Sequence, residues 1–117
     1  MKLVVAIIPP DRLDRALDAL TDSHVHGLTV SDVRGFGQEH DLSHPDHREF
    51  PGLILKRKTR IEIACHDAEV EGILQAIQSV AQTGQRGDGK VWVLELTDAL
   101  RLKTGERGAS ALGPERK

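Results

Sequence analysis

The spacing of hydrophobic residues along this chain follows one pattern twice. A segment with strand-like spacing is followed by one with helix-like spacing, and a second strand-like segment comes after each helix-like one. Strict alternation is typical of strands, whereas apolar residues every three to four positions form one face of a helix. The predicted strands span 2–8, 27–36, 56–65 and 91–96, and the predicted helices span about 11–22 and, behind an N-cap at Asp67, 70–81. This order predicts an α+β, ferredoxin-like fold with two helices on one face of a four-stranded antiparallel sheet.

The composition fits a single domain and excludes several classes of protein. A chain of 117 residues can bury one core, and with one Trp, two Phe and no Tyr that core must be aliphatic. A net charge of -2 gives no basis for binding nucleic acid or an anionic membrane. The single cysteine excludes an internal disulfide framework and a Cys-based zinc cluster.

Hydropathy gives no sign of a membrane segment or a secretory leader. No apolar run approaches the roughly 20 residues that a membrane-spanning helix needs. The apolar opening run reaches Pro9 and Pro10 too soon for a signal peptide. We therefore expect a cytoplasmic protein that meets a membrane only through a partner.

The predicted strands at 2–8 and 91–96 are apolar on both faces. Two helices cover only one face of the sheet, so the other face needs a partner. A second copy of the chain is the simplest one, and the sequence therefore predicts self-association.

Two clusters are candidate anion sites. The glycine-rich stretch 83–90 can bring backbone N–H groups close to a phosphate chain, although it lacks P-loop spacing and is equally typical of a flexible turn. Arg86 and Lys90 supply charge within this stretch, and the nearby Arg101 and Lys103 add charge that favours an anionic nucleotide. Lys56, Lys58 and Arg60 share one strand face, which either binds an anion or protects a sheet edge.

Several stretches together carry a family resemblance. They are Lys2-Leu3-Val4, Ala6-Ile7-Ile8, Gly27-Leu28-Thr29-Val30, Gly35-Phe36-Gly37, Lys58-Thr59-Arg60-Ile61-Glu62, Thr83-Gly84, Gly87-Asp88-Gly89-Lys90 and Arg101-Leu102-Lys103-Thr104-Gly105-Glu106. On these residues the chain resembles the PII signal-transduction family over about 1–108. The remaining residues, 109–117, are predicted to form a flexible tail.

The resemblance implies a homotrimer of ferredoxin-like domains that binds ATP, ADP or AMP between subunits. It implies that the loop 87–90 cradles the phosphates and that Arg101 and Lys103 reach them from the neighbouring subunit. Position 103 is lysine where arginine is usual. A guanidinium can bind a phosphate through two hydrogen bonds at once, whereas the lysine ammonium offers a single compact charge. The nucleotide-binding residues implied are Thr29, Gly35, Phe36, Gly37, Ala64, Gly87, Asp88, Gly89, Lys90, Arg101 and Lys103. Of these, Thr29 and Ala64 match positions around adenine and ribose.

The segment 37–55 corresponds to the arm called the T-loop, through which family members engage transporters and enzymes. The tyrosine that many bacterial members carry there aligns with Pro51, so this chain lacks that modification site. The glutamine that helps to hold Mg²⁺ and 2-oxoglutarate aligns with Glu39, whose charge repels a dicarboxylate. Lys58 is retained. We therefore expect bicarbonate rather than 2-oxoglutarate as the anion effector at Glu39 and Lys58, with Mg²⁺ as an optional ion.

Histidines within the same segment suggest a second function. His40, His44 and His47 lie within eight residues and belong to the types that bind Zn, Ni or Cu, although exposed histidines in a solvated loop are the simpler interpretation. The leading hypothesis is a nucleotide-binding sensor that controls a transporter or enzyme. The alternative is a metal-responsive member of the same family. No nucleophile–base or acid–base pair is evident, so we expect no enzymatic activity.

Overall fold

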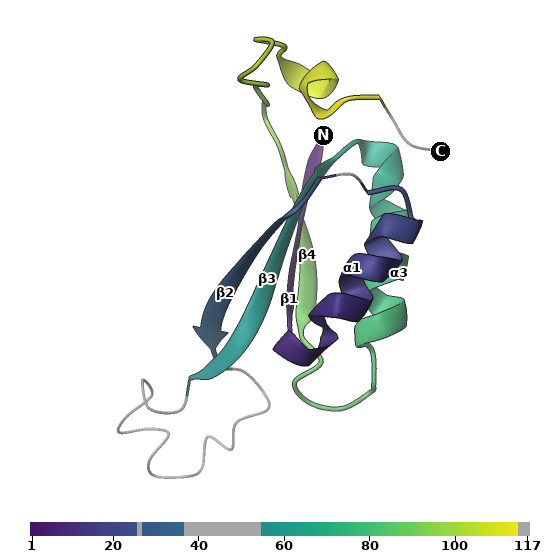
Figure 1. Ribbon diagram of the computed structural model, residues 1–117, viewed down its shortest axis with the longest axis vertical. Helices are drawn as coiled ribbons and strands as arrows, with labels where there is room; N and C mark the ends of the chain where they lie inside the picture. Colours follow the sequence, from purple (N-terminus) through teal and green to yellow (C-terminus); the bar gives the residue numbers. More distant parts are fainter. Residues whose placement is uncertain (26, 37–54, 115–117) are drawn as a thin grey trace.

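The computed structural model describes residues 1–25, 27–36 and 55–114, which form one sheet with both α-helices on one face (Figure 1). Its elements are the strands β1 (Lys2–Ile8), β2 (Thr29–Gly35), β3 (Lys56–Cys65) and β4 (Lys90–Glu95), the helices α1 (Leu13–Asp22) and α3 (Val70–Ala81), and the 3-10 helices η1 (Pro10–Arg12), η3 (Asp67–Glu69) and η4 (Gly108–Leu112). The strands pair antiparallel in the order β2-β3-β1-β4. The predicted α+β, ferredoxin-like fold is confirmed.

The core lies between the sheet and the two helices. Val4 and Ala6 of β1 pair with Ile63 and Ile61 of β3, and all four are almost fully buried. The helices add Ala16, Leu20, Ile73, Ala76, Ile77 and Ala81. Burying one large aliphatic side chain is worth about 1.5–3 kcal/mol, so this aliphatic layer stabilises the fold without aromatic residues.

The opposite face of the sheet is apolar along β1 and β4. Strand residues alternate between faces, so Leu3 and Val5 of β1 point away from the helices, beside Leu94 and Trp92 of β4. Trp92 and Leu94 remain 47% and 45% exposed. Within the described part of the chain, no element lies over this face to cover them.

Strand β3 lies inside the sheet and pairs on one side with β1 and on the other with β2. The interpretation of Lys56, Lys58 and Arg60 as protection of a sheet edge is therefore wrong. The predicted alternation along β3 is correct, because Thr59 and Ile61 are buried toward the helices while these cations lie on the other face.

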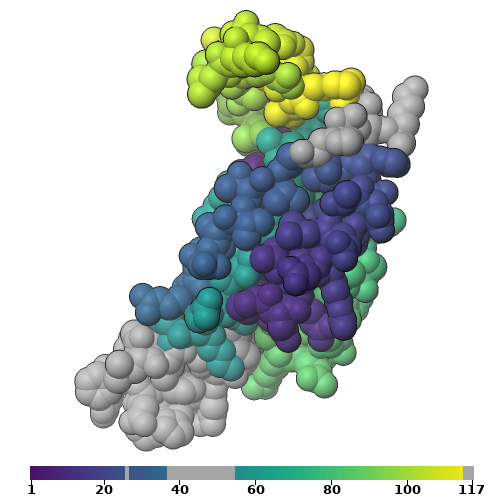
Figure 2. Space-filling view, viewed as in Figure 1, coloured from purple at the N-terminus to yellow at the C-terminus, as the bar shows by residue number. Residues whose placement is uncertain are grey.

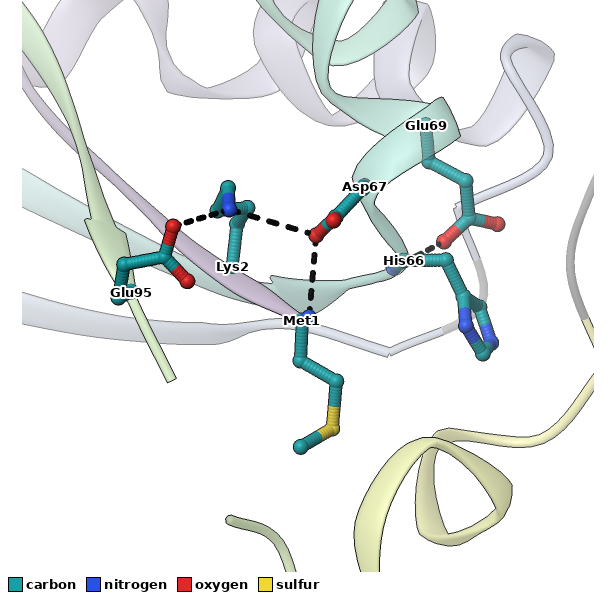
Figure 3. Close-up of polar contacts among 6 residues, drawn as sticks. All are labelled: Met1, Lys2, His66, Asp67, Glu69 and Glu95. Atoms are coloured by element: carbon teal, nitrogen blue, oxygen red, sulfur yellow. Dashed lines mark hydrogen bonds and ion pairs between the residues drawn. The ribbon is translucent and has the colours of Figure 1, made fainter. Parts of the chain in front are cut away.

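Asp67 does not cap helix α3 as predicted. The chain enters α3 through η3, whose N-cap is His66. The Asp67 carboxylate lies 3.0 Å from the Met1 ammonium nitrogen and 3.5 Å from Lys2 Nζ, and Lys2 also pairs with Glu95 (Figure 3). These cations lower the pKa of Asp67, and the hydrogen bond from the N-terminal ammonium contributes most.

The residues that follow β4 gather at one end of the molecule, beyond the sheet (Figure 2). They contain η4, which the prediction of a flexible tail over 109–117 did not anticipate. Residues 109–114 make defined contacts with the rest of the chain, and 115–117 lie outside the described residues.

Candidate functional site

The glycine-rich loop between α3 and β4 is closed by one carboxylate. Asp88 Oδ2 accepts hydrogen bonds from the backbone N–H of Thr83 at 2.7 Å and of Gly84 at 2.9 Å, and the Thr83 hydroxyl donates to Asp88 Oδ1. These bonds lower the pKa of Asp88, with the Thr83 hydroxyl contributing most. The side chain of Asp88 is thus engaged inside the loop and braces its shape.

All three glycines of this loop have a positive φ, which residues with a side chain rarely adopt, and that of Gly84 is 83°. Gly87 and Gly89 have φ values of 94° and 104°. A Cβ atom placed on Gly89 would lie only 2.0 Å from the Ile7 carbonyl oxygen. The loop therefore packs directly onto the end of β1, at a distance that only glycine permits.

The loop forms one wall of a cleft of about 370 Å³. In the antiparallel sheet, the ends of β1 and β2 and the beginnings of β3 and β4 meet at the same sheet end. The cleft at this end is lined by Ile7, Gly35, Phe36, Lys58, Gln85, Arg86, Gly87, Asp88, Gly89, Lys90 and Trp92. Three of these side chains are cationic, and the glycine backbone lies beside them. This arrangement suits a polyanion such as a phosphate chain.

Two other predicted residues, Thr29 and Ala64, lie in a separate cavity. This cavity has a volume of about 430 Å³ and is lined mostly by apolar and small residues near the opposite ends of β2 and β3. Thr29 begins β2 and Gly35 ends it. A strand rises roughly 3.3 Å per residue, so the six residues from Thr29 to Gly35 place Thr29 about 20 Å from the cleft beside the glycine-rich loop.

Arg101 and Lys103 belong to a hairpin beyond β4, where Leu100 and Arg107 form an isolated bridge. Asp98 braces the base of this hairpin by pairing with Arg107 and by accepting a hydrogen bond from the Gly108 N–H at 3.2 Å. The Arg107 hydrogen bond is the main cause of the lowered pKa of Asp98. Arg101 lies against η4 rather than in the cleft formed by its own chain.

Comparison with known proteins matches most of this chain to one family. The model of the family described as "Nitrogen regulatory protein P-II" matches residues 1–106. The chain belongs to the P-II family. A P-II protein of Rhodospirillum rubrum is 38% identical over 112 residues, which cover 96% of this chain and all of that protein. "Nitrogen regulatory protein P-II 2" of Methanothermobacter thermautotrophicus is 37% identical over 112 residues, covering 96% of this chain and 97% of that protein.

Membership of the P-II family makes this chain a signal-transduction regulator. P-II proteins are regulatory rather than catalytic, which fits the expectation that the chain is not an enzyme. No helix in the described ranges is both long and apolar enough to cross a membrane.

The predicted P-II nucleotide residues fall into three groups on one chain. Gly35, Phe36, Gly87, Asp88, Gly89 and Lys90 share the cleft with Lys58; Thr29 and Ala64 share the second cavity; and Arg101 and Lys103 lie in the hairpin. Gly37 and Glu39 lie outside the described residues, as do the candidate metal ligands His40, His44 and His47. Among the residues that are described, no three His, Cys, Asp or Glu side chains form a metal-binding group.

Sequence reasoning missed several residues that line the two cavities. Ile7 and Trp92 contribute apolar surface to the cleft. Leu112 and Pro114 line the second cavity. These four reach the cavities through sheet pairing or through the fold of the C-terminal segment, whereas Arg86 was expected to supply charge beside the glycines.

Proposed function

We propose that this P-II protein is an adenine-nucleotide sensor that works in the cytoplasm as a homotrimer, with each site shared by two subunits. The observation that carries this proposal is the separation of the two half-sites on one chain. The glycine-loop cleft and the cavity at Thr29 and Ala64 lie about 20 Å apart along β2. A nucleotide that uses both must bridge two chains, one of which provides the phosphate half and the other the base half.

The uncovered face of the sheet supports assembly. Trp92 and Leu94 expose apolar surface beside Leu3 and Val5, and burying such a patch between copies is favourable. Self-association on this face would also bring the glycine loop of one chain toward another chain.

The chemistry of the two half-sites supports a nucleotide. The cleft offers Lys58, Arg86 and Lys90 beside backbone that only glycine can form, which suits the phosphates of ATP, ADP or AMP. The cavity at Thr29 and Ala64 combines apolar and small residues with the polar side chains of His24, Glu62 and Glu69, and this mixed lining suits a planar base with polar edges. Arg101 and Lys103 lie at the same end of the molecule as this cavity and would approach the phosphates from that side, across the interface.

The anion effector would bind near Lys58, at the edge of the phosphate cleft. Glu39 belongs to the same proposed effector site and places a negative charge where the P-II pattern has a neutral glutamine. Two like charges 4 Å apart repel by roughly 4 kcal/mol at an effective dielectric constant of 20. This favours bicarbonate over the dicarboxylate 2-oxoglutarate, with Mg²⁺ as an optional companion ion. The T-loop, 37–55, would carry the signal to a transporter or enzyme.

Mixing two damaged variants tests the shared site. Lys90→Ala weakens the phosphate half, and Ala64→Trp fills the base half. Each contact between a cation and a phosphate is worth about 1.5–3 kcal/mol, so Lys90→Ala should bind ADP at least tenfold more weakly than the wild type. When both variants are co-expressed with different tags, each purified mixed trimer should regain one intact site.

Light scattering supplies the assembly measurement and should give about three times 12.8 kDa. Calorimetry on the mixed trimers should show tight ADP binding with about one site per trimer. A monomer at micromolar concentration, or mixed trimers without a tight site, would contradict the proposal.

A further inference from the structure

The C-terminal segment 108–114 is held against the rest of the protein by several hydrogen bonds. The Arg101 Nε–H donates to the Ala111 carbonyl oxygen at 3.2 Å. His66 Nε2 lies 2.8 Å from the Gly113 carbonyl oxygen, and because a carbonyl only accepts, Nε2 carries the proton of this bond. The segment thus connects the end of β3 with the hairpin that carries Arg101.

The backbone of the segment suits this position. Gly113 has a φ of 83°, which allows the chain to turn between Leu112 and Pro114. At its other end, the Gly108 N–H donates to the Ala99 carbonyl at 2.9 Å and to Asp98 Oδ1 at 3.2 Å. Hydrogen bonds therefore hold both ends of the segment. Its start is bonded to Ala99 and Asp98 across the hairpin, and its end is bonded to His66, which is distant in sequence.

The same segment forms part of the cavity at Thr29 and Ala64. Leu112 and Pro114 line this cavity and add apolar surface to it. Leu112 is partly buried and Pro114 is exposed, and about 430 Å³ remains open beside them. The segment is therefore a wall of the cavity and leaves room for a ligand.

We propose that segment 108–114 is a positioning element that builds the base half of the nucleotide site and orients Arg101 toward the phosphates. Leu112 and Pro114 form an apolar wall for the base, the Ala111 carbonyl holds the Arg101 guanidinium, and His66 is the positioning residue that anchors the segment. This inference rests on the proposed nucleotide function and adds residues to its site.

The arrangement lowers the cost of binding because its parts are ordered before the ligand arrives. A long arginine side chain loses rotamer freedom when it grips a phosphate, and a hydrogen bond that restrains it beforehand reduces that loss. An apolar wall acts on the base alone, whereas Arg101 acts on the phosphates alone. The two contributions can therefore be measured separately with ligands that contain only one of these groups.

Leu112→Ser tests the wall, and Leu112→Met is its matched control because it keeps an apolar side chain of similar volume. Leu112→Ser should weaken ADP binding by about five- to tenfold through lost apolar contact with the base. Binding of inorganic tripolyphosphate, which has no base, should not change. Leu112→Met, which keeps most of the apolar surface, should lose clearly less ADP affinity than Leu112→Ser.

His66→Phe tests the anchor, and His66→Gln is the control because its amide can still donate to the Gly113 carbonyl. His66→Phe should weaken both ADP and tripolyphosphate, since releasing the segment frees Arg101 as well as the wall. His66→Gln should recover most of the affinity for both ligands. Circular dichroism and light scattering on each variant establish that fold and assembly are intact.

Two outcomes would overturn the inference. Unchanged ADP affinity in both Leu112→Ser and His66→Phe would mean that the segment does not take part in binding. Tighter ADP binding in these variants would mean that the segment obstructs the site. Failure of the wild-type protein to bind ADP at all is a distinct result, which overturns the proposed function and this inference with it.

Discussion

Replacing Gly89 with alanine should displace the glycine-rich loop and abolish tight nucleotide binding. The new Cβ would lie 2.0 Å from the Ile7 carbonyl oxygen, whereas ordinary Cβ contacts begin at 3.4 Å. The loop must therefore retreat from β1 by at least about 1 Å, because Cβ contacts shorter than 3.0 Å essentially never occur and the Ile7 carbonyl belongs to the backbone of β1. The φ of 104° adds strain of about 1–3 kcal/mol for a residue that carries a side chain.

Gly84→Ala is the matched control, because Gly84 lies in the same loop and also has a positive φ. Comparing the two variants separates the effect of the close contact with Ile7 from the effect of backbone strain. Gly84 also has a positive φ, 83°, but nothing lies within 4 Å of its added Cβ. Both variants lose stability through backbone strain, and only Gly89→Ala must also move the loop. A shift of more than 1 Å breaks at least one backbone hydrogen bond to a phosphate, and a charge-assisted bond of about 1.5–3 kcal/mol corresponds to roughly 10- to 100-fold in affinity.

Calorimetry with ADP measures the affinity, and urea unfolding at a fixed protein concentration measures the stability. Gly89→Ala should bind ADP at least tenfold more weakly than Gly84→Ala and should unfold at a lower urea concentration. Equal affinity and equal stability of the two variants would refute the reasoning, because the contact with Ile7 would then carry no cost.

Three further predictions concern single charged residues. The pKa of Asp88 is lowered by its bonds to Thr83 and Gly84, so its stabilising effect is present above the unfolded pKa of about 3.9 and is lost as the pH falls through the lower folded value. Asp88→Asn should therefore melt at a lower temperature than the wild type at pH 7, with the difference shrinking below about pH 4; a constant difference would contradict this. Arg101→Ala should weaken ADP binding at least tenfold by calorimetry, and an unchanged affinity would place the phosphates elsewhere. Glu39→Gln should increase affinity for 2-oxoglutarate in the presence of Mg²⁺ and nucleotide, whereas no gain would exclude charge repulsion as the cause.

Elements with strong local patterns were predicted well from the sequence. The predicted and observed bounds of β3 agree, because alternation places Thr59, Ile61 and Ile63 toward the helices over a long stretch. The periodic apolar residues from Val70 to Ala81 likewise match α3. In both cases the burial of one face is encoded by neighbours in sequence, so local spacing was sufficient.

Features that depend on distant contacts were not predicted. Asp67 is a residue type that often caps a helix N-terminus. In the fold, however, the Met1 ammonium and Lys2 lie beside it, and its carboxylate pairs with these cations instead of with the helix backbone. The ordered contacts of segment 108–114 depend on the bond between His66 and Gly113, which are 47 positions apart. That segment is made mostly of small residues, and its sequence shows no periodicity that could reveal such a partner.

The position of the two half-sites at opposite ends of β2 and β3 has a consequence for how ligands would be counted. In the proposed trimer each chain contributes its glycine-loop end to one site and its Thr29 end to a different site. Every subunit therefore serves two ligands at once, through one continuous pair of strands. A nucleotide bound at the first site restrains a chain that also forms part of the next site. Binding at the three sites of the proposed trimer will therefore be coupled, and successive dissociation constants will differ.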